Sequence, residues 1–339
     1  FICERALVVG TTASYRSMFS RLPELMRKGP SIFTQQQQQQ QHGPIEESHN
    51  QGQEEEEEGQ GFEREEVVPP LVGRRRAPLV HQEAADERGM PLARLEHPKD
   101  GRADLVLAHP ERRNATSIGL LEEAITLIQG LGSDRSVLVI RGEGPHFCAG
   151  IDLDEVLENS ETCFRLLRLL SQLMRAVRRV PAITIAPVQG AAIGGGFGLL
   201  CACDFAIGTP NTKVGYPPLE LGLSPALMTP WLVQKIGPSP ARAFMLRGGT
   251  TSGTEAARLG LLTDLVPEEE LSESTDRLAD QLLGADPTAL RTTKRFLNHV
   301  EGSDQDLILD HAADVSATLM SQDETQRRVS SFRQPPNQH

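Results

Sequence analysis

An uncharged stretch of 24 residues, at positions 180–203, limits the possible folds of this chain more than any other feature. A stretch of this length could cross a membrane as one helix. Two prolines, Pro181 and Pro187, and a run of glycines interrupt it, however, and the sequence has no second comparable stretch. The pattern instead predicts a buried strand at 182–187, a glycine bend, and a helix from 194 to about 203. We therefore expect no membrane span.

Short apolar runs alternate with helical patterns from about residue 90 onward, which is typical of an α/β domain. We expect a core at 90–280 and a C-terminal helical region at 281–330. The periodicity predicts strands at 105–108 and 137–140, helices at 118–128 and 162–177, later helices at 252–261, 271–283, 288–299 and 306–320, and frayed residues from about 332.

The first 89 residues have the composition of a disordered leader. They include a glutamine run at 35–41 and ten Glu with one Arg at 31–66, so this tract carries most of the net charge of −12. The basic residues 1–31, with several Ser and Thr, resemble a mitochondrial transit remnant, whereas a plain leader would leave the protein cytoplasmic or peroxisomal. A chain this acidic has no broad basic surface, so we expect no nucleic-acid partner.

The five cysteines form neither a secreted disulfide framework nor a C-x-x-C zinc pattern. Cys201 and Cys203 lie two apart on a predicted helix, which turns them to different faces. We therefore expect ordinary buried thiols, a reducing compartment and no metal site.

The glycine-rich segment 189–198 is the first candidate for chemistry. Gly194, Gly195 and Gly196 begin a helix directly after a buried strand, so backbone amides can point outward at the helix N-terminus. The segment lacks dinucleotide-binding spacing, because Leu199 stands where the last glycine would be, and no Walker lysine follows. An anion site and a close-packed glycine turn both fit this pattern.

A second bend of small residues, at 144–153, follows the predicted strand at 137–140. Ala149 and Gly150 allow a close approach of the backbone, and strand ends are where α/β folds place ligands. The two bends together could aim a pair of N–H donors at one oxygen. A thioester carbonyl needs such a pair if it is to become an enolate during a reaction.

Three motifs resemble the crotonase superfamily, which contains the enoyl-CoA hydratases and isomerases. They are Phe-Cys-Ala-Gly-Ile-Asp at 147–152, Gly-Ala-Ala-Ile-Gly-Gly-Gly at 190–196 and Leu-Gly-Leu-Ser-Pro-Ala at 221–226. The resemblance covers about 105–267, and the segments 196–208 and 221–230 are most similar to the methylglutaconyl-CoA hydratase branch. It implies a crotonase-like spiral of ββα units with a C-terminal helical region, assembled as a homotrimer or a dimer of trimers.

The resemblance also implies which residues hold the substrate. The backbone amides of Ala149 and Gly195 would form the oxyanion hole. The acyl-CoA thioester is itself the substrate, so no separate cofactor is expected. Its CoA part would contact the two bends and one of two arginines, which gives the set Arg112, Arg113, Ala149, Gly150, Ile151, Asp152, Gly194 and Gly195.

The catalytic carboxylates depart from the family pattern. Hydratases of the family use two glutamates, one to activate water and one to protonate the α-carbon. These positions correspond to Gly198 and Pro218, and the methylglutaconyl branch commonly has glycine at the first. Glu220 would supply the second carboxylate if the chain after Pro218 is extended, whereas in a helix it would point elsewhere, as a solvated structural residue. Weaker substitutes are Glu143, His146, Asp152 and Asp154.

The sequence therefore predicts hydration or dehydration of an enoyl-CoA thioester, in particular a branched, methylglutaconyl-type one, with Glu220 as acid and base. Enoyl-CoA isomerisation needs only one base and is the nearest alternative, and acyl-CoA decarboxylation depends more on enolate stabilisation than on a base. A non-catalytic acyl-CoA-binding homologue is a third alternative, because both family glutamates are replaced.

Overall fold

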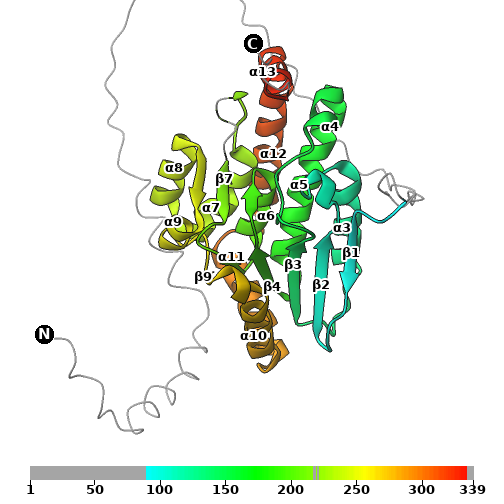
Figure 1. The fold of residues 1–339 in the computed structure, drawn as a ribbon, viewed down its shortest axis with the longest axis vertical. Helices are drawn as coiled ribbons and strands as arrows, with labels where there is room; N and C mark the ends of the chain where they lie inside the picture. Colours follow the sequence, from blue (N-terminus) through cyan, green and yellow to red (C-terminus); the bar gives the residue numbers. More distant parts are fainter. Residues whose placement is uncertain (1–88, 217–218, 220, 334–339) are drawn as a thin grey trace, which may run out of the picture. The chain divides into compact units, whose positions relative to one another are not determined.

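The computed structural model describes residues 89–216, 219 and 221–333. A six-stranded sheet, a three-stranded sheet and helices that predominate towards the C-terminus make up this part of the chain (Figure 1). Apart from Gly89, the leader predicted at 1–89 lies outside the described residues. The observed architecture confirms the predicted α/β fold with a helical C-terminal region.

The six-stranded sheet has the order β1-β2-β3-β4-β6-β9. The β1–β2 pair is antiparallel and the other four pairs are parallel. Every residue of β2 and β4 is buried, as expected for parallel strands that are covered on both faces. The predicted strands are confirmed as β2, β3 and β4. The strand bounds are Ala93–Glu96 (β1), Arg102–Leu107 (β2), Val137–Gly142 (β3), Ile183–Val188 (β4), Phe205–Gly208 (β6) and Asp264–Leu265 (β9).

The smaller sheet has the order β5-β7-β8, with strands Ala191–Ile193, Lys213–Tyr216 and Gly249–Ser252. Two isolated parallel bridges, Cys148 with Ala192 and Thr116 with Ile151, tie the loop after β3 to neighbouring segments on both of its sides. This loop is the second small-residue bend of the sequence. It is therefore held between β5 and the segment before α3.

The central helices are α3 (Ile118–Gln129), α4 (Leu153–Glu158), α5 (Ser160–Arg179) and α6 (Gly195–Ala202). Helix α3 begins where the Ser117 side chain accepts a hydrogen bond from the Leu120 amide. Helix α5 buries its apolar stripe, which includes Leu166, Leu170 and Met174, against the main core. The predicted helices at 118–128, 162–177 and 194–203 are confirmed with small shifts at their ends.

The C-terminal region is helical, and α10 lies at the opposite end of the ribbon from α12 and α13 (Figure 1). The helix predicted at 252–261 starts late, because Ser252 ends β8 and caps α9. Of the residues predicted to be frayed from about 332, only Phe332 and Arg333 lie within the described residues, and both belong to α13. The helices are α7 (Thr229–Ile236), α8 (Pro238–Arg247), α9 (Gly253–Arg258), α10 (Leu271–Leu283), α11 (Pro287–Val300), α12 (Asp306–Met320) and α13 (Asp323–Arg333).

The uncharged stretch at 180–203 folds as β4, β5 and α6 with turns between them. Among the helices in the described ranges, none combines the length and apolarity that crossing a membrane requires. Cys201 and Cys203 are buried free thiols, as predicted, and burial raises the pKa of each to about 12.

A buried ion pair attaches α11 to the larger sheet. The Lys294 ammonium lies 2.8 Å from a carboxylate oxygen of Asp204, which precedes β6, and donates to the Ala182 carbonyl at 2.8 Å. The same Asp204 oxygen accepts from the Thr184 backbone amide and hydroxyl. Burial lowers the pKa of Lys294, and the charge of Asp204 partly restores it. This desolvated ion pair is one of the contacts that hold α11, beside the hydrogen bond of 3.0 Å that the Asn298 side chain donates to the Arg178 carbonyl.

Replacing Lys294 with Met is expected to lower the free energy of unfolding by about 3 kcal/mol, because the change leaves the Asp204 carboxylate without its nearest cation. Urea unfolding followed by circular dichroism measures this loss. Thr293→Met, at the exposed neighbouring position, is the matched control and should change stability by less than about 0.5 kcal/mol. Equal stability of the two variants would contradict the role assigned to the ion pair.

Candidate active site

A cavity of about 500 Å³ lies where the two small-residue bends meet. Ala149, Gly150 and Ile151 line it from the loop after β3, and Gly194 and Gly195 line it from the start of α6. The bends are in contact, because a Cβ atom placed on Gly194 would lie 3.5 Å from the Gly150 Cα atom. The structure thus brings together the two segments that the sequence singled out separately.

The bend at 144–153 aims one backbone amide away from its neighbouring segment. The Gly150 carbonyl accepts hydrogen bonds from the Thr116 amide at 2.7 Å and the Thr116 hydroxyl at 3.1 Å. The carbonyl and the following N–H of a trans peptide point in opposite directions, so the Ile151 N–H points away from Thr116. Gly150 has a φ of +113°, which a side chain would strain, and this conformation sets the direction of the peptide.

The prediction that the Ala149 amide is an oxyanion donor is wrong. Ala149 lines the cavity, but its N–H donates to the Arg113 carbonyl at 3.0 Å. The Asp152 N–H likewise donates to the Thr116 carbonyl at 3.0 Å. Between these two bonds lies Ile151, a residue of the cavity wall whose amide has no hydrogen-bond acceptor within the described residues.

The glycine-rich bend at 189–198 presents the first amide of α6. Gly194 has a φ of +54° and precedes the helix, and its own N–H donates to the Gly215 carbonyl at 3.0 Å. The first N–H groups of a helix have no intrahelical acceptor, which leaves the Gly195 amide available at the cavity wall. A Cβ atom on Gly195 would lie 3.5 Å from the Ile151 side chain. The Ile151 and Gly195 backbones are therefore adjacent.

The predicted arginines line the cavity, in different electrostatic settings. Arg112 is 52% exposed and forms a 2.8 Å ion pair with Asp154. Arg113, in the left-handed region with a φ of +53°, forms no ion pair with any other described residue. Asp152 caps α4 by accepting from the Asp154 amide at 2.9 Å, so its carboxylate has a structural contact that shapes the loop.

The substitutes considered for the family carboxylates are placed differently. The Glu143 carboxylate pairs with Arg94 and does not line the cavity. His146 does line it, and its Nδ1 atom is buried with no hydrogen-bond partner among the described residues. Pro218 and Glu220 lie outside the described residues. None of the described residues that line the cavity is Asp or Glu.

Neighbouring methionine side chains occupy the space beside Gly198, the position of the first family glutamate. Gly198 is buried in α6, and a Cβ atom there would lie 2.7 Å from the Met174 sulfur and 2.9 Å from Met228 Cγ. At contacts this short, even a single Cβ atom would require one of the two methionine side chains to shift. The apolar residues around Gly198 thus exclude a carboxylate from this position.

Three polar residues of the cavity wall were missed by the sequence analysis. The Tyr216 hydroxyl donates to the Ser224 carbonyl at 3.1 Å, and the Ser316 hydroxyl donates to the same carbonyl at 3.3 Å. Burial raises the pKa of Tyr216, so its phenol is neutral and can donate a proton or a hydrogen bond but is no base. Ser224 lies within the motif at 221–226, but no motif marks Tyr216 or Ser316, and Ser316 joins the site only through folding of α12.

The remaining cavity wall is apolar and comes from several elements. Helix α5 and helix α12 each contribute to it, as does the 3₁₀ turn at Ala226–Met228. The apolar side chains are Leu153, Leu167, Ile193, Leu221, Leu223, Leu227, Met228, Met320 and Phe332. The Cys148 thiol is buried beside the bend, where burial raises its pKa to about 11. No group of three or more His, Cys, Asp or Glu residues in the described ranges could hold a metal ion.

The chain is similar to proteins whose names describe enoyl-CoA hydratases or isomerases. The family model described as enoyl-CoA hydratase/isomerase matches residues 99–336. An enoyl-CoA isomerase/hydratase of Mycosarcoma maydis is 35% identical over 207 residues, which cover 57% of this chain and 76% of that protein. The enoyl-CoA hydratase domain-containing protein 3, mitochondrial, of Homo sapiens is 31% identical over 187 residues and covers 54% of this chain and 62% of that protein.

Among solved structures, an enoyl-CoA hydratase from Mycobacterium avium has a TM-score of 0.64 and 26% identity, and the match covers 71% of this chain and 95% of that one. The shared fold is mixed α/β with C-terminal helices.

Restoring the family carboxylate by Gly198→Glu is expected to lower the free energy of unfolding by more than about 3 kcal/mol, because the charge would be buried among methionines. Gly198→Ala is the graded control and should cost about 1 kcal/mol, since overpacking is partly offset by the helix propensity of alanine. Thermal unfolding measures both. A Glu variant as stable as the parent protein would contradict the packing argument.

Proposed function

The chain belongs to the enoyl-CoA hydratase/isomerase family, and we propose that it hydrates and dehydrates an enoyl-CoA thioester through an enolate held by the Ile151 and Gly195 amides. The observation that carries this proposal is the pair of adjacent backbone amides at one cavity wall, both without an acceptor in the described residues. The resemblance in the sequence assigned the second donor to Gly195, and the structure favours Ile151 over Ala149 as the first.

In the proposed mechanism, the thioester carbonyl oxygen accepts both amide N–H groups. Addition of water to the double bond turns this oxygen into an enolate oxyanion, and preorganised donors stabilise the developing charge most strongly where water is excluded. The neighbouring apolar wall, which includes Leu167 and Leu227, supports such exclusion. The proposed CoA-binding residues are those of the two bends, Gly150, Ile151, Asp152, Gly194 and Gly195, with Ala149, Arg112 and Arg113.

Proton transfer is proposed to depend on Glu220. Hydration requires a base for water and an acid for the α-carbon. Gly198 cannot provide either group, and Tyr216 is neutral. Tyr216 and Leu221, on either side of Glu220 in the sequence, both line the cavity, which supports a role for this segment at the reacting atoms. In this proposal the Glu220 carboxylate acts as base and, once protonated, as acid.

Isomerisation is the second candidate. The described cavity wall contains no carboxylate, and a single base is enough to move a proton from one carbon to another. The Mycosarcoma maydis relative carries both activities in its name. Acyl-CoA decarboxylation and non-catalytic acyl-CoA binding remain alternatives to the proposed reaction, since each needs fewer acid and base groups than hydration does.

The nature of the acyl group is also a proposal. A methylglutaconyl group carries a second carboxylate, which needs a cation, and the described arginines of the cavity are Arg112 and Arg113. The side formed by α5, α12 and the 3₁₀ turn is apolar, which favours an uncharged acyl chain over the methylglutaconyl type implied by the sequence resemblance. A mitochondrial location, supported by the human relative, and a homotrimer or dimer of trimers complete the proposal.

Purified full-length protein is expected to hydrate crotonyl-CoA, and with a higher kcat/KM than 3-methylglutaconyl-CoA, because the apolar wall does not compensate a second carboxylate. Loss of the conjugated-thioester absorbance measures both reactions. Glu220→Gln should lower kcat by about 100-fold or more if the carboxylate transfers the proton. Binding of crotonyl-CoA without turnover of either substrate would contradict the enzyme proposal, and unchanged turnover in Glu220→Gln would exclude Glu220.

Gly195→Pro is expected to lower kcat by about 100-fold or more, because it removes a proposed oxyanion donor. Proline is well tolerated at the first position of a helix, which Gly195 occupies in α6. Gly195→Ala is the matched control, since it adds the same Cβ atom but keeps the N–H. Equal kcat values for the Pro and Ala variants would contradict the role of this amide.

A further inference from the structure

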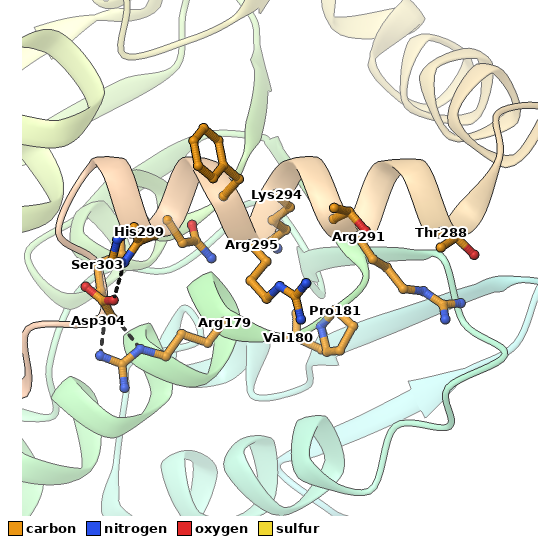
Figure 2. Close-up of a pocket in the computed structure, with 13 residues that line it drawn as sticks. Arg179, Val180, Pro181, Thr288, Arg291, Lys294, Arg295, His299, Ser303 and Asp304 are labelled. Carbon is orange, nitrogen blue, oxygen red and sulfur yellow. Dashed lines mark hydrogen bonds and ion pairs between the residues drawn. The ribbon is translucent and has the colours of Figure 1, made fainter. Parts of the chain in front are cut away.

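A second cavity, of about 730 Å³, lies along one side of α11 and shares no lining residue with the candidate active site. It is bounded by the turn at Val180 and Pro181 and by the end of α5. Arg291 and Arg295 extend from α11 toward this turn, and Arg179 lies farther along the same groove (Figure 2). The groove is therefore lined by three guanidinium groups.

The three guanidinium groups differ in how far their donors are used. Arg179 donates to the Ser303 carbonyl at 3.0 and 2.7 Å and pairs with Asp306 at 2.8 Å. Arg291 donates through one terminal nitrogen to the Ser133 carbonyl at 2.6 Å, and its Nε atom is buried without a hydrogen-bond partner. These contacts fix Arg179 and Arg291 in place.

Arg295 is exposed and has no hydrogen bond or ion pair with any other described residue. It follows Arg291 by four positions, so the two side chains leave the same face of α11. Two like charges at this spacing destabilise a helix, and an anion between them removes that cost. Guanidinium groups bind phosphate oxygens with paired, charge-assisted hydrogen bonds.

The acidic groups near the groove are already engaged. The Lys294 ammonium is paired with Asp204, and the Asp304 carboxylate lies 3.0 Å from the His299 ring. Figure 2 places Asp304 beside Arg179, at the other end of the groove from Arg291. Neither Arg291 nor Arg295 forms an ion pair with any described residue, so this half of the groove presents two unpaired positive charges within a chain of net charge −12.

We propose that this groove binds the phosphate group of a nucleotide-sized ligand, with the phosphate between Arg291 and Arg295. The volume lies within the range of small-molecule sites and is much larger than a single phosphate needs. The apolar surface of Val180 and Pro181 borders the remaining space and suits a sugar or a base. The site is separate from the proposed hydratase reaction and does not depend on it.

Titration of adenosine monophosphate and inorganic phosphate into the full chain at low ionic strength, followed by calorimetry, tests the proposal. Adenosine monophosphate is expected to bind more tightly than phosphate, and Arg295→Gln should weaken its binding about tenfold or more through loss of a charge-assisted contact. Raising the salt concentration should weaken binding as well. Arg295→Gln should keep the KM for crotonyl-CoA, because Arg295 does not line the catalytic cavity.

Arg242→Gln is the matched control, since Arg242 is an exposed arginine on α8 that lies outside the groove. It should leave the affinity for adenosine monophosphate unchanged. Urea unfolding of both variants should give the same midpoint, which separates lost binding from lost folding. The proposal is overturned if neither probe binds, if Arg242→Gln weakens binding as much as Arg295→Gln, or if the two probes bind equally well.

Discussion

The orientation of one peptide unit, between Gly150 and Ile151, is the constraint on which the candidate active site depends. Thr116 holds the Gly150 carbonyl through two hydrogen bonds, and the trans geometry of the peptide then turns the Ile151 amide the opposite way. A residue with a side chain at position 150 would be strained at the observed φ of +113°. Glycine is therefore needed for the direction of the neighbouring donor as well as for close approach.

The tight packing around α6 that supports the amide pair also leaves little space for the first glutamate of the family, at the position of Gly198. At the start of α6, Gly195 lies close to Leu170 of α5 and to Ile151 of the loop after β3, and one turn later Gly198 lies against Met174 and Met228. Methionine fills irregular space and needs a neighbour without a side chain here. The chain thus combines a preorganised oxyanion site with an apolar interior at the position where family members carry a glutamate. Residues outside α6 must therefore transfer the proton.

The sequence predicted the helices and strands that have strong hydrophobic periodicity. Its predictions failed where contacts between distant segments determine the local structure. Helix α10 matches its predicted bounds, 271–283, because its apolar stripe is a local feature. Strand β8 was missed, since Gly249–Ser252 becomes a strand only by pairing with β7. The donor in the bend at 144–153 was misassigned for a similar reason. Whether Ala149 or Ile151 is available depends on the carbonyl groups of Arg113 and Thr116, which no spacing within 147–152 reveals.

The low dielectric of the cavity determines how a single carboxylate would act as acid and base there. In an apolar wall the amide dipoles of Ile151 and Gly195 act at low dielectric, so they stabilise an enolate more than they would in water. The same low dielectric raises the pKa of any carboxylate there and lets it hold a proton near neutral pH. One carboxylate in such a setting can accept a proton from water and later deliver it to carbon. An oxyanion pair in an apolar cavity therefore makes a single acid and base group chemically sufficient, provided that the group reaches both atoms.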